Sequence, residues 1–153
     1  MSVQLIGRLA ERGDAPLGDR CPIDRALQTI GNRTAILLLR EIFYGASRFD
    51  VLVRRTGVSE AVAAQRLREL VDAGALTKEP YREPGQRTRN AYVLTEAGHD
   101  LLPALLALLE WGAAHTEGRA PAVTHAGCGE QVGVELRCAA GHQVREGEIA
   151  VGG

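Results

Sequence analysis

Basic and amide side chains gather between Arg48 and Arg89. This stretch holds nine Arg or Lys residues against six Asp or Glu residues, although the whole chain has a net charge of −1. Arginine and lysine neutralise nucleic-acid phosphates, and arginine and glutamine form bidentate hydrogen bonds with guanine and adenine. These residue types favour binding to double-stranded DNA. A solvated charged surface is the alternative explanation.

Two short helices separated by a tight turn must position these groups. Ser47 is suited to cap a helix over 48–55, in which Phe49, Leu52 and Val53 face the core. The sequence Thr56-Gly57-Val58-Ser59 predicts a turn, with Gly57 at positive φ and Ser59 capping a helix from Glu60 to Ala73.

The helix over 60–73 is predicted to have two different faces. Ala63, Leu67 and Leu70 cluster on one side of a helical wheel. The opposite side is polar or small, with Arg66 at the border, and it is formed by Ala61, Gln65, Arg68 and Asp72, flanked by Ala64. One face can therefore pack on the protein while the other enters a groove of DNA.

A basic β-ribbon is predicted directly after this helix. Leu76–Tyr81 and Arg89–Leu94 have strand character, and Arg82–Thr88 forms the tip between them. Two helices, a tight turn and a basic ribbon are typical of a winged helix-turn-helix. The predicted fold class is thus mainly α with a small β-wing (α+β).

Within this fold each candidate DNA-binding residue has an expected role. Gln65 and Arg68 are the best candidates to read base edges. The ribbon would contact phosphates or a minor groove, and Ser59 with its free backbone N–H groups could hold a phosphate. The complete predicted set is Arg48, Arg54, Arg55, Ser59, Ala61, Ala64, Gln65, Arg66, Arg68, Lys78, Arg82, Gln86, Arg87 and Arg89.

Helices on either side of this unit are expected to complete the domain and to pair two chains. One helix begins at Pro22 and is broken at Gly31-Asn32, and the next runs over 34–43 with Ile36, Leu37, Leu39, Ile42 and Phe43 buried. A last long helix, capped by Thr95, is leucine-rich nearly all round. We therefore expect a partner helix from a second subunit to cover it, with burial inside its own chain as the alternative.

Cys21 lies just before Pro22 and the start of a helix. The positive helix end, Arg20 and Arg25 favour its thiolate form, whereas Asp19 and Asp24 oppose it. Cys21 is therefore either a partly buried packing residue or a redox or electrophile sensor.

The last 36 residues contain two pairs of soft metal ligands. His125 and Cys128 form one pair, Cys138 and His142 form the other, and Val132, Val134 and Leu136 alternate like a strand between them. Such pairs on glycine-containing turns are compatible with a small zinc ribbon, in which two thiolates balance Zn(II). A small β-hairpin without metal and a redox-active cysteine pair are the alternatives.

Composition limits the other function classes. The apolar content of 45% supports a real core, whereas 4% aromatic residues argue against stacking on single-stranded nucleic acid. No signal peptide, membrane span, Ser-His-Asp order, phosphate loop or dinucleotide fingerprint is expected, so we predict a cytoplasmic protein that is not an enzyme. A winged-helix protein-interaction module without DNA binding is the competing class, against which the basic ribbon argues.

Several short motifs together resemble the HxlR-type branch of the MarR-like winged-helix transcription regulators. They are Cys21-Pro22, Gly45-Ala46-Ser47-Arg48-Phe49, Arg66-Leu67-Arg68-Glu69-Leu70, Tyr81-Arg82-Glu83-Pro84-Gly85-Gln86-Arg87, Tyr92-Val93-Leu94-Thr95-Glu96-Ala97-Gly98 and Trp111-Gly112. The resemblance covers about 21–115. It implies a bacterial, nucleoid-associated regulator that binds an inverted repeat as a homodimer through its terminal helices.

The resemblance also implies a chemical signal and a domain plan. Some relatives sense electrophiles or oxidants with a cysteine at the position of Cys21, and a small hydrophobic effector is a further candidate signal. One departure is Gly31-Asn32-Arg33-Thr34, where the family usually has a tryptophan. The expected organisation is an N-terminal arm (1–20), a winged-helix and dimerisation domain (21–117) and a β-hairpin or zinc-ribbon-like tail (118–153).

Overall fold

The computed structural model describes residues 2–18 and 21–152, which form two compact units. The described part of one unit comprises residues 21–109. The other unit combines residues 2–18 with residues 110–152. No helix among the described residues is long and apolar enough to cross a membrane.

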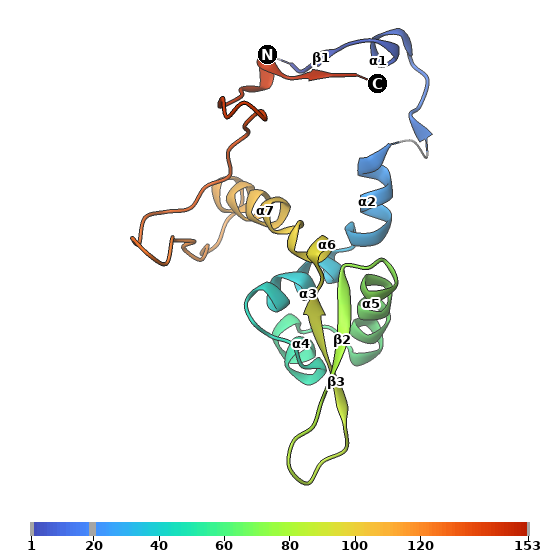
Figure 1. The fold of residues 1–153 in the computed structure, drawn as a ribbon, viewed down its shortest axis with the longest axis vertical. Coiled ribbons are helices and arrows are strands. Elements are labelled where there is room, and N and C mark those ends of the chain that lie inside the picture. The colour runs from blue at the N-terminus through green and yellow to red at the C-terminus, as the bar shows by residue number, and fades with distance from the viewer. Residues whose placement is uncertain (1, 19–20, 153) are drawn as a thin grey trace. The chain divides into compact units, whose positions relative to one another are not determined.

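The unit formed by residues 21–109 is a winged helix-turn-helix, as the sequence predicts. Its helices are α2 (Pro22–Ile30), α3 (Arg33–Phe43), α4 (Phe49–Thr56), α5 (Glu60–Asp72) and α6 (Glu96–His99). Strands β2 (Leu76–Tyr81) and β3 (Arg89–Leu94) pair antiparallel, with Leu76 opposite Leu94 and Tyr81 opposite Arg89. We call β2, the tip at residues 82–88 and β3 the wing, which projects beyond α3, α4 and α5 (Figure 1).

The core of this unit lies between α3, α4, α5 and the start of β2. Its fully buried large side chains are Leu38, Leu39, Leu52, Leu67, Leu70 and Leu76. On α3 the prediction of Leu39 and Ile42 as buried is confirmed. Ile36, Leu37 and Phe43 are only half-buried, whereas Ala35 and Leu38 are buried instead. The buried face of α3 is therefore rotated from the one predicted.

The helix boundaries follow from local capping, with one exception. The Asn32 side chain accepts a hydrogen bond from the Thr34 N–H at 2.8 Å, and this begins α3. Ser47 was predicted to cap α4, but the N-cap is Arg48. The reason is that Ser47 and Arg48 lie against β3: the Ser47 carbonyl accepts the Tyr92 N–H at 2.8 Å, and Arg48 bridges Ala91.

The single long helix predicted after Thr95 is two separate helices in the structure. α6 ends at His99, and α7 (Leu102–His115) begins three residues later. Pro103 lacks an N–H, and in a continuous helix its ring would clash with the carbonyl of His99, four residues earlier. Thr95 caps α6 as predicted, because its hydroxyl accepts the Gly98 N–H at 3.1 Å.

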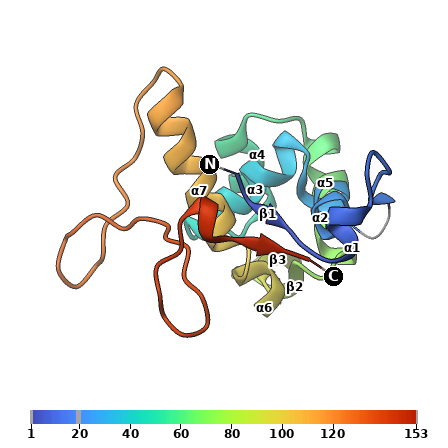
Figure 2. The ribbon, with the colours of Figure 1, turned by 90° about the horizontal axis from the view of Figure 1, so that it is seen from above.

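The second unit contains little regular structure. β1 (Gln4–Leu5) pairs in parallel with β4 (Ala150–Val151), as Figure 2 also shows. The remaining elements are α1 (Arg8–Glu11), the one-turn helix η2 (Glu146–Glu148) and the end of α7. The strand predicted around Val132–Leu136 is absent among the described residues, and two turns closed by single β-bridges flank this segment instead.

Candidate nucleic-acid interface

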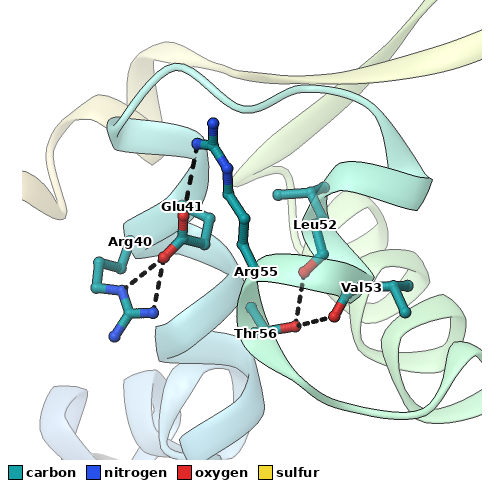
Figure 3. Close-up of polar contacts among 6 residues, drawn as sticks. All are labelled: Arg40, Glu41, Leu52, Val53, Arg55 and Thr56. Atoms are coloured by element: carbon teal, nitrogen blue, oxygen red, sulfur yellow. Dashed lines mark hydrogen bonds and ion pairs between the residues drawn. The ribbon is translucent and has the colours of Figure 1, made fainter.

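The turn between α4 and α5 is fixed by three side-chain and backbone features. The Thr56 hydroxyl donates to the Leu52 carbonyl at 2.7 Å, which closes the last turn of α4 (Figure 3). Gly57 has φ +69°, the left-handed conformation that favours glycine, as predicted. The Ser59 hydroxyl accepts the Val62 N–H at 3.4 Å and caps α5, which the sequence also predicts.

A buried carboxylate links α3 to α4. Glu41 on α3 is 7% exposed, and its carboxylate is held by Arg40 at 2.7 Å (Figure 3). Arg55 on α4 reaches the other carboxylate oxygen at 3.8 Å. Arg55, a predicted phosphate contact, therefore also connects the first helix of the helix-turn-helix to the helix beneath it.

We expect Glu41→Gln to lower the free energy of unfolding by about 1–2 kcal/mol. The amide keeps the shape of the side chain but loses the charge that both guanidinium groups face. The cost is smaller than the ~3–5 kcal/mol of a fully buried pair, because both arginines are partly exposed to solvent. Urea denaturation measures the change, with Glu79→Gln on the exposed face of β2 as the control. Equal stability of the two variants would contradict the structural role of Glu41.

The two faces of α5 lie where the sequence predicts them. Ala63, Leu67 and Leu70 are fully buried in the core. The opposite face is exposed along its length through Ala61, Gln65, Arg68 and Asp72, and Ala64 at its flank is half-buried. α5 is thus held to the protein along one side and presents a continuous second side to solvent.

Two of the side chains on α5 that are predicted to contact DNA are paired with Glu69. Arg66 pairs with the Glu69 carboxylate at 2.5 Å, and the Gln65 side-chain amide donates to it at 3.1 Å. The hydrogen bond from Arg66 lowers the pKa of Glu69, and the one from Gln65 lowers it further. Gln65 must therefore leave Glu69 to read a base, whereas Arg68 is exposed on the same face.

Arg48 lies against the far end of β2, where the tip of the wing begins. Its guanidinium pairs with Glu83 at 2.6 Å and stands over the ring of Tyr81, 5.3 Å from the centroid. Glu83 first, and then Tyr81 and Asp50, raise the pKa of Arg48 despite the opposing effect of burial. Arg48 therefore connects the start of α4 to the point where the tip leaves the strands of the wing. Sequence reasoning missed this contact, because Glu83 is 35 residues away and no local pattern joins the two.

The tip of the wing is a tight turn that presents arginines. The Gln86 N–H donates to the Glu83 carbonyl at 3.0 Å, with Pro84 and Gly85 (φ +78°) between them, as in a type II turn. Arg82 donates to the Gln86 carbonyl at 3.0 Å. The other predicted phosphate contacts of the wing, Lys78, Arg87 and Arg89, are all exposed.

The remaining predicted DNA contact lies on α4. Arg54 pairs with Asp50 one turn earlier, at 3.3 Å. Burial tends to raise the pKa of Asp50, but Arg48 and Arg54 together lower it below its ordinary value. Arg54 is itself well exposed and lies in the last turn of α4.

The predicted sensor and metal residues lie outside this interface. Cys21 is half-buried at the N-cap of α2, while Asp19 and Arg20, which were predicted to influence it, fall outside the described residues. His125 and Cys128 contact each other. Over residues 2–18 and 21–152, no three His, Cys, Asp or Glu side chains are grouped so that they could hold a metal ion.

A capped turn between two helices, with one exposed helix face and a basic wing, defines the winged helix-turn-helix class of DNA-binding proteins. Residues 29–120 match the model of the HxlR-like helix-turn-helix family. The chain belongs to this family, and the predicted resemblance is confirmed.

Similar proteins support the assignment to this family. The chain is 38% identical over 119 residues to Rv3095, an HTH-type transcriptional regulator of Mycobacterium tuberculosis, covering 76% of this chain and 74% of the relative. It is similar in structure to PA1607, a candidate transcription factor, with TM-score 0.74 and 27% identity over 84% of this chain and 92% of that one. The reduced redox regulator HypR is 28% identical, with TM-score 0.55 over 61% of this chain and 92% of its own. This protein is thus a transcriptional regulator of the helix-turn-helix type.

Proposed function

We propose that the protein binds an inverted repeat in double-stranded DNA as a homodimer and so controls transcription. The observation that carries the proposal is the exposed face of α5, with Gln65 and Arg68 on the side opposite the buried leucines. This face fits the major groove, and the wing brings Arg82, Arg87 and Arg89 to the flanking phosphates.

The homodimer is supported by apolar helix faces that one chain leaves exposed. On α7, Leu108 is 55% and Trp111 is 61% exposed, and α7 has no buried residue. On α2, Ile23 is 70% and Leu27 is 57% exposed, although both lie on the apolar side of a strongly amphipathic helix. Exposed apolar area of this kind marks a protein interface, and a second copy of the chain supplies matching surfaces.

Two substitutions distinguish the residues that recognise bases from those that contact phosphates. Arg87→Ala should weaken binding to every duplex and reduce the slope of log K against log salt concentration by about 1. Arg68→Ala should cost about 1–3 kcal/mol on the operator and relax the preference at one base position of each half-site. Fluorescence anisotropy with the operator selected from genomic fragments, across a salt series, measures both effects.

The same titration with a random duplex distinguishes the alternative of a protein-interaction module. A DNA-binding regulator should show weak, strongly salt-dependent binding to random DNA that Arg87→Ala reduces. Unchanged affinity of both variants for the operator would show that α5 and the wing are assigned to the wrong surface.

Cys21 is the proposed sensor of a thiol-reactive signal. The likeness to HypR, a redox regulator, supports this role, as does the half-buried position of Cys21 at the start of α2. Alkylation of the native protein should modify Cys21 and change operator affinity. Cys21→Ser should bind the operator normally and keep that affinity after treatment, although its exposed Cys128 and Cys138 still react. Alkylation of Cys21 without a change in DNA affinity would leave it a packing residue.

A small hydrophobic effector is a separate prediction. It is tested by adding such ligands to the Cys21→Ser protein and measuring its affinity for the operator.

A further inference from the structure

The C-terminal tail contains two turns built on the same plan, each with a cysteine and a histidine at its tip. In the first, Thr124 bridges Gln131, and the His125 carbonyl accepts the Gly129 N–H at 2.8 Å. The second turn has similar contacts and is one residue shorter. There, Arg137 bridges Gln143, and the Cys138 carbonyl accepts the Gly141 N–H at 2.8 Å. In each turn the bridge begins at the residue immediately before the first of the two soft ligands.

The first turn already holds its two ligands side by side. His125 Nδ1 lies 3.2 Å from Cys128 Sγ. Zn–N and Zn–S bonds of about 2.0 and 2.3 Å at a tetrahedral angle place two such atoms roughly 3.5 Å apart. The imidazole ring also folds over Gly127, where an added Cβ would lie 2.8 Å from a ring carbon. Gly127 thus leaves room for the ring orientation that the pair requires.

The unit that contains the tail has no hydrophobic core. None of its described residues, 2–18 and 110–152, is buried, and Val123, Val132, Val134 and Val144 are only half-buried. Two single bridges and a two-residue parallel pair provide little stabilisation. Small structures of this kind normally need a disulfide or a metal ion to stay folded. All three cysteines of the chain are free thiols here.

We propose that His125, Cys128, Cys138 and His142 together bind one Zn(II) ion, which links the two turns and stabilises the tail. The spacings His-x2-Cys and Cys-x3-His fall within those of structural zinc sites, and two thiolates neutralise the charge of the ion. Each thiol loses its proton as its sulfur binds the metal. Because no three of these groups meet among the described residues, the second turn moves onto the first when the ion binds.

The loop between the turns permits this movement. Only residues 129–137 connect Cys128 to Cys138, and they form no regular strand. The outer parts of the segment bond within the two turns, as where the Val132 N–H donates to the Val123 carbonyl and the Val144 N–H to the Leu136 carbonyl. Its middle contacts α7, where the Glu110 carboxylate accepts the Val134 N–H at 3.0 Å. This contact lies between the two turns, so each can rotate about it.

Metal titration of the full-length protein, produced without a histidine tag, tests the site. Elemental analysis should find one zinc ion per chain. Replacement by Co(II) should give the intense d–d bands of tetrahedral cobalt and a thiolate charge-transfer band. Cys128→Ser and Cys138→Ser should each weaken affinity by more than about 100-fold, since even outer-shell groups account for 10–100-fold. Cys21→Ser, the matched cysteine control, should bind metal as the wild type does.

A second measurement follows the structure of the tail. Zinc should slow trypsin cleavage after Arg137 and Arg145 in the wild type and in Cys21→Ser, but not in the two tail variants. Three results would overturn the proposal. They are absence of metal uptake with formation of a Cys128–Cys138 disulfide, unchanged affinity in Cys138→Ser, or cobalt spectra typical of six oxygen and nitrogen ligands.

Discussion

Leu108→Asp should separate the proposed homodimer into single chains and lower affinity for the inverted repeat by about 100-fold or more. Leu101, Leu105 and Leu108 lie on one side of the helical register, and the first two pack against the core. Leu108 continues this row one turn beyond the core and is 55% exposed. A carboxylate there would be buried without a partner in a dimer, whereas in a single chain it faces water. Loss of the second half-site removes the avidity of two linked contacts, typically 10²–10⁴-fold.

Light scattering and operator titration together measure this result. Leu108→Met, which preserves apolar volume, should remain a dimer and bind normally. Circular dichroism should be the same for all three proteins, because Leu108 contributes little to the fold of one chain. A wild-type protein with the mass of one chain, or a Leu108→Asp protein that stays dimeric, would show that α7 does not join the subunits.

The helix-turn-helix and the wing, which carry the candidate interface, could be predicted in large part because their determinants are local in sequence. Ser59 begins α5, Gly57 supplies the left-handed turn residue, and Pro84-Gly85 closes the wing tip, each through contacts within a few positions. The two faces of α5 follow from helical periodicity alone. Such features need no knowledge of the rest of the chain, and the structure confirms them.

The parts that the sequence did not predict depend on distant partners. Arg48 was predicted to contact phosphate, and no local signal reveals its pairing with Glu83 on the wing. Glu41 could not be recognised as buried, because its burial depends on how α4 packs on α3 and brings Arg55 near. The pairing of Gln4–Leu5 with Ala150–Val151 joins the two ends of the chain. The helix break at Pro103, by contrast, was available from sequence, since proline restricts the preceding turn in any context.

Gly98→Ala should destabilise the winged-helix unit by about 1–3 kcal/mol, the typical cost of overpacking a well-packed site. An ideal Cβ at Gly98 would lie 2.1 Å from the carbonyl oxygen of Ala75, and backbone cannot yield as a flexible side chain can. The contact is close because Thr95 ties the start of α6 to the turn between α5 and β2. The Thr95 hydroxyl donates to the Gly74 carbonyl at 2.5 Å, and the Thr95 N–H donates to the Ala75 carbonyl at 3.1 Å.

Helix propensity predicts the opposite sign for the same substitution, which makes the experiment decisive. Alanine in place of a helical glycine ordinarily stabilises by up to about 1 kcal/mol. Ala97→Gly, at the neighbouring exposed position, measures propensity alone and should cost no more than about 1 kcal/mol. Urea denaturation of both variants therefore separates sterics from propensity. A Gly98→Ala protein as stable as the wild type would mean that α6 does not approach Ala75, just before β2, as closely as the structure indicates. In that case Thr95 would cap α6 without also fixing how the wing joins the helix that leads to α7.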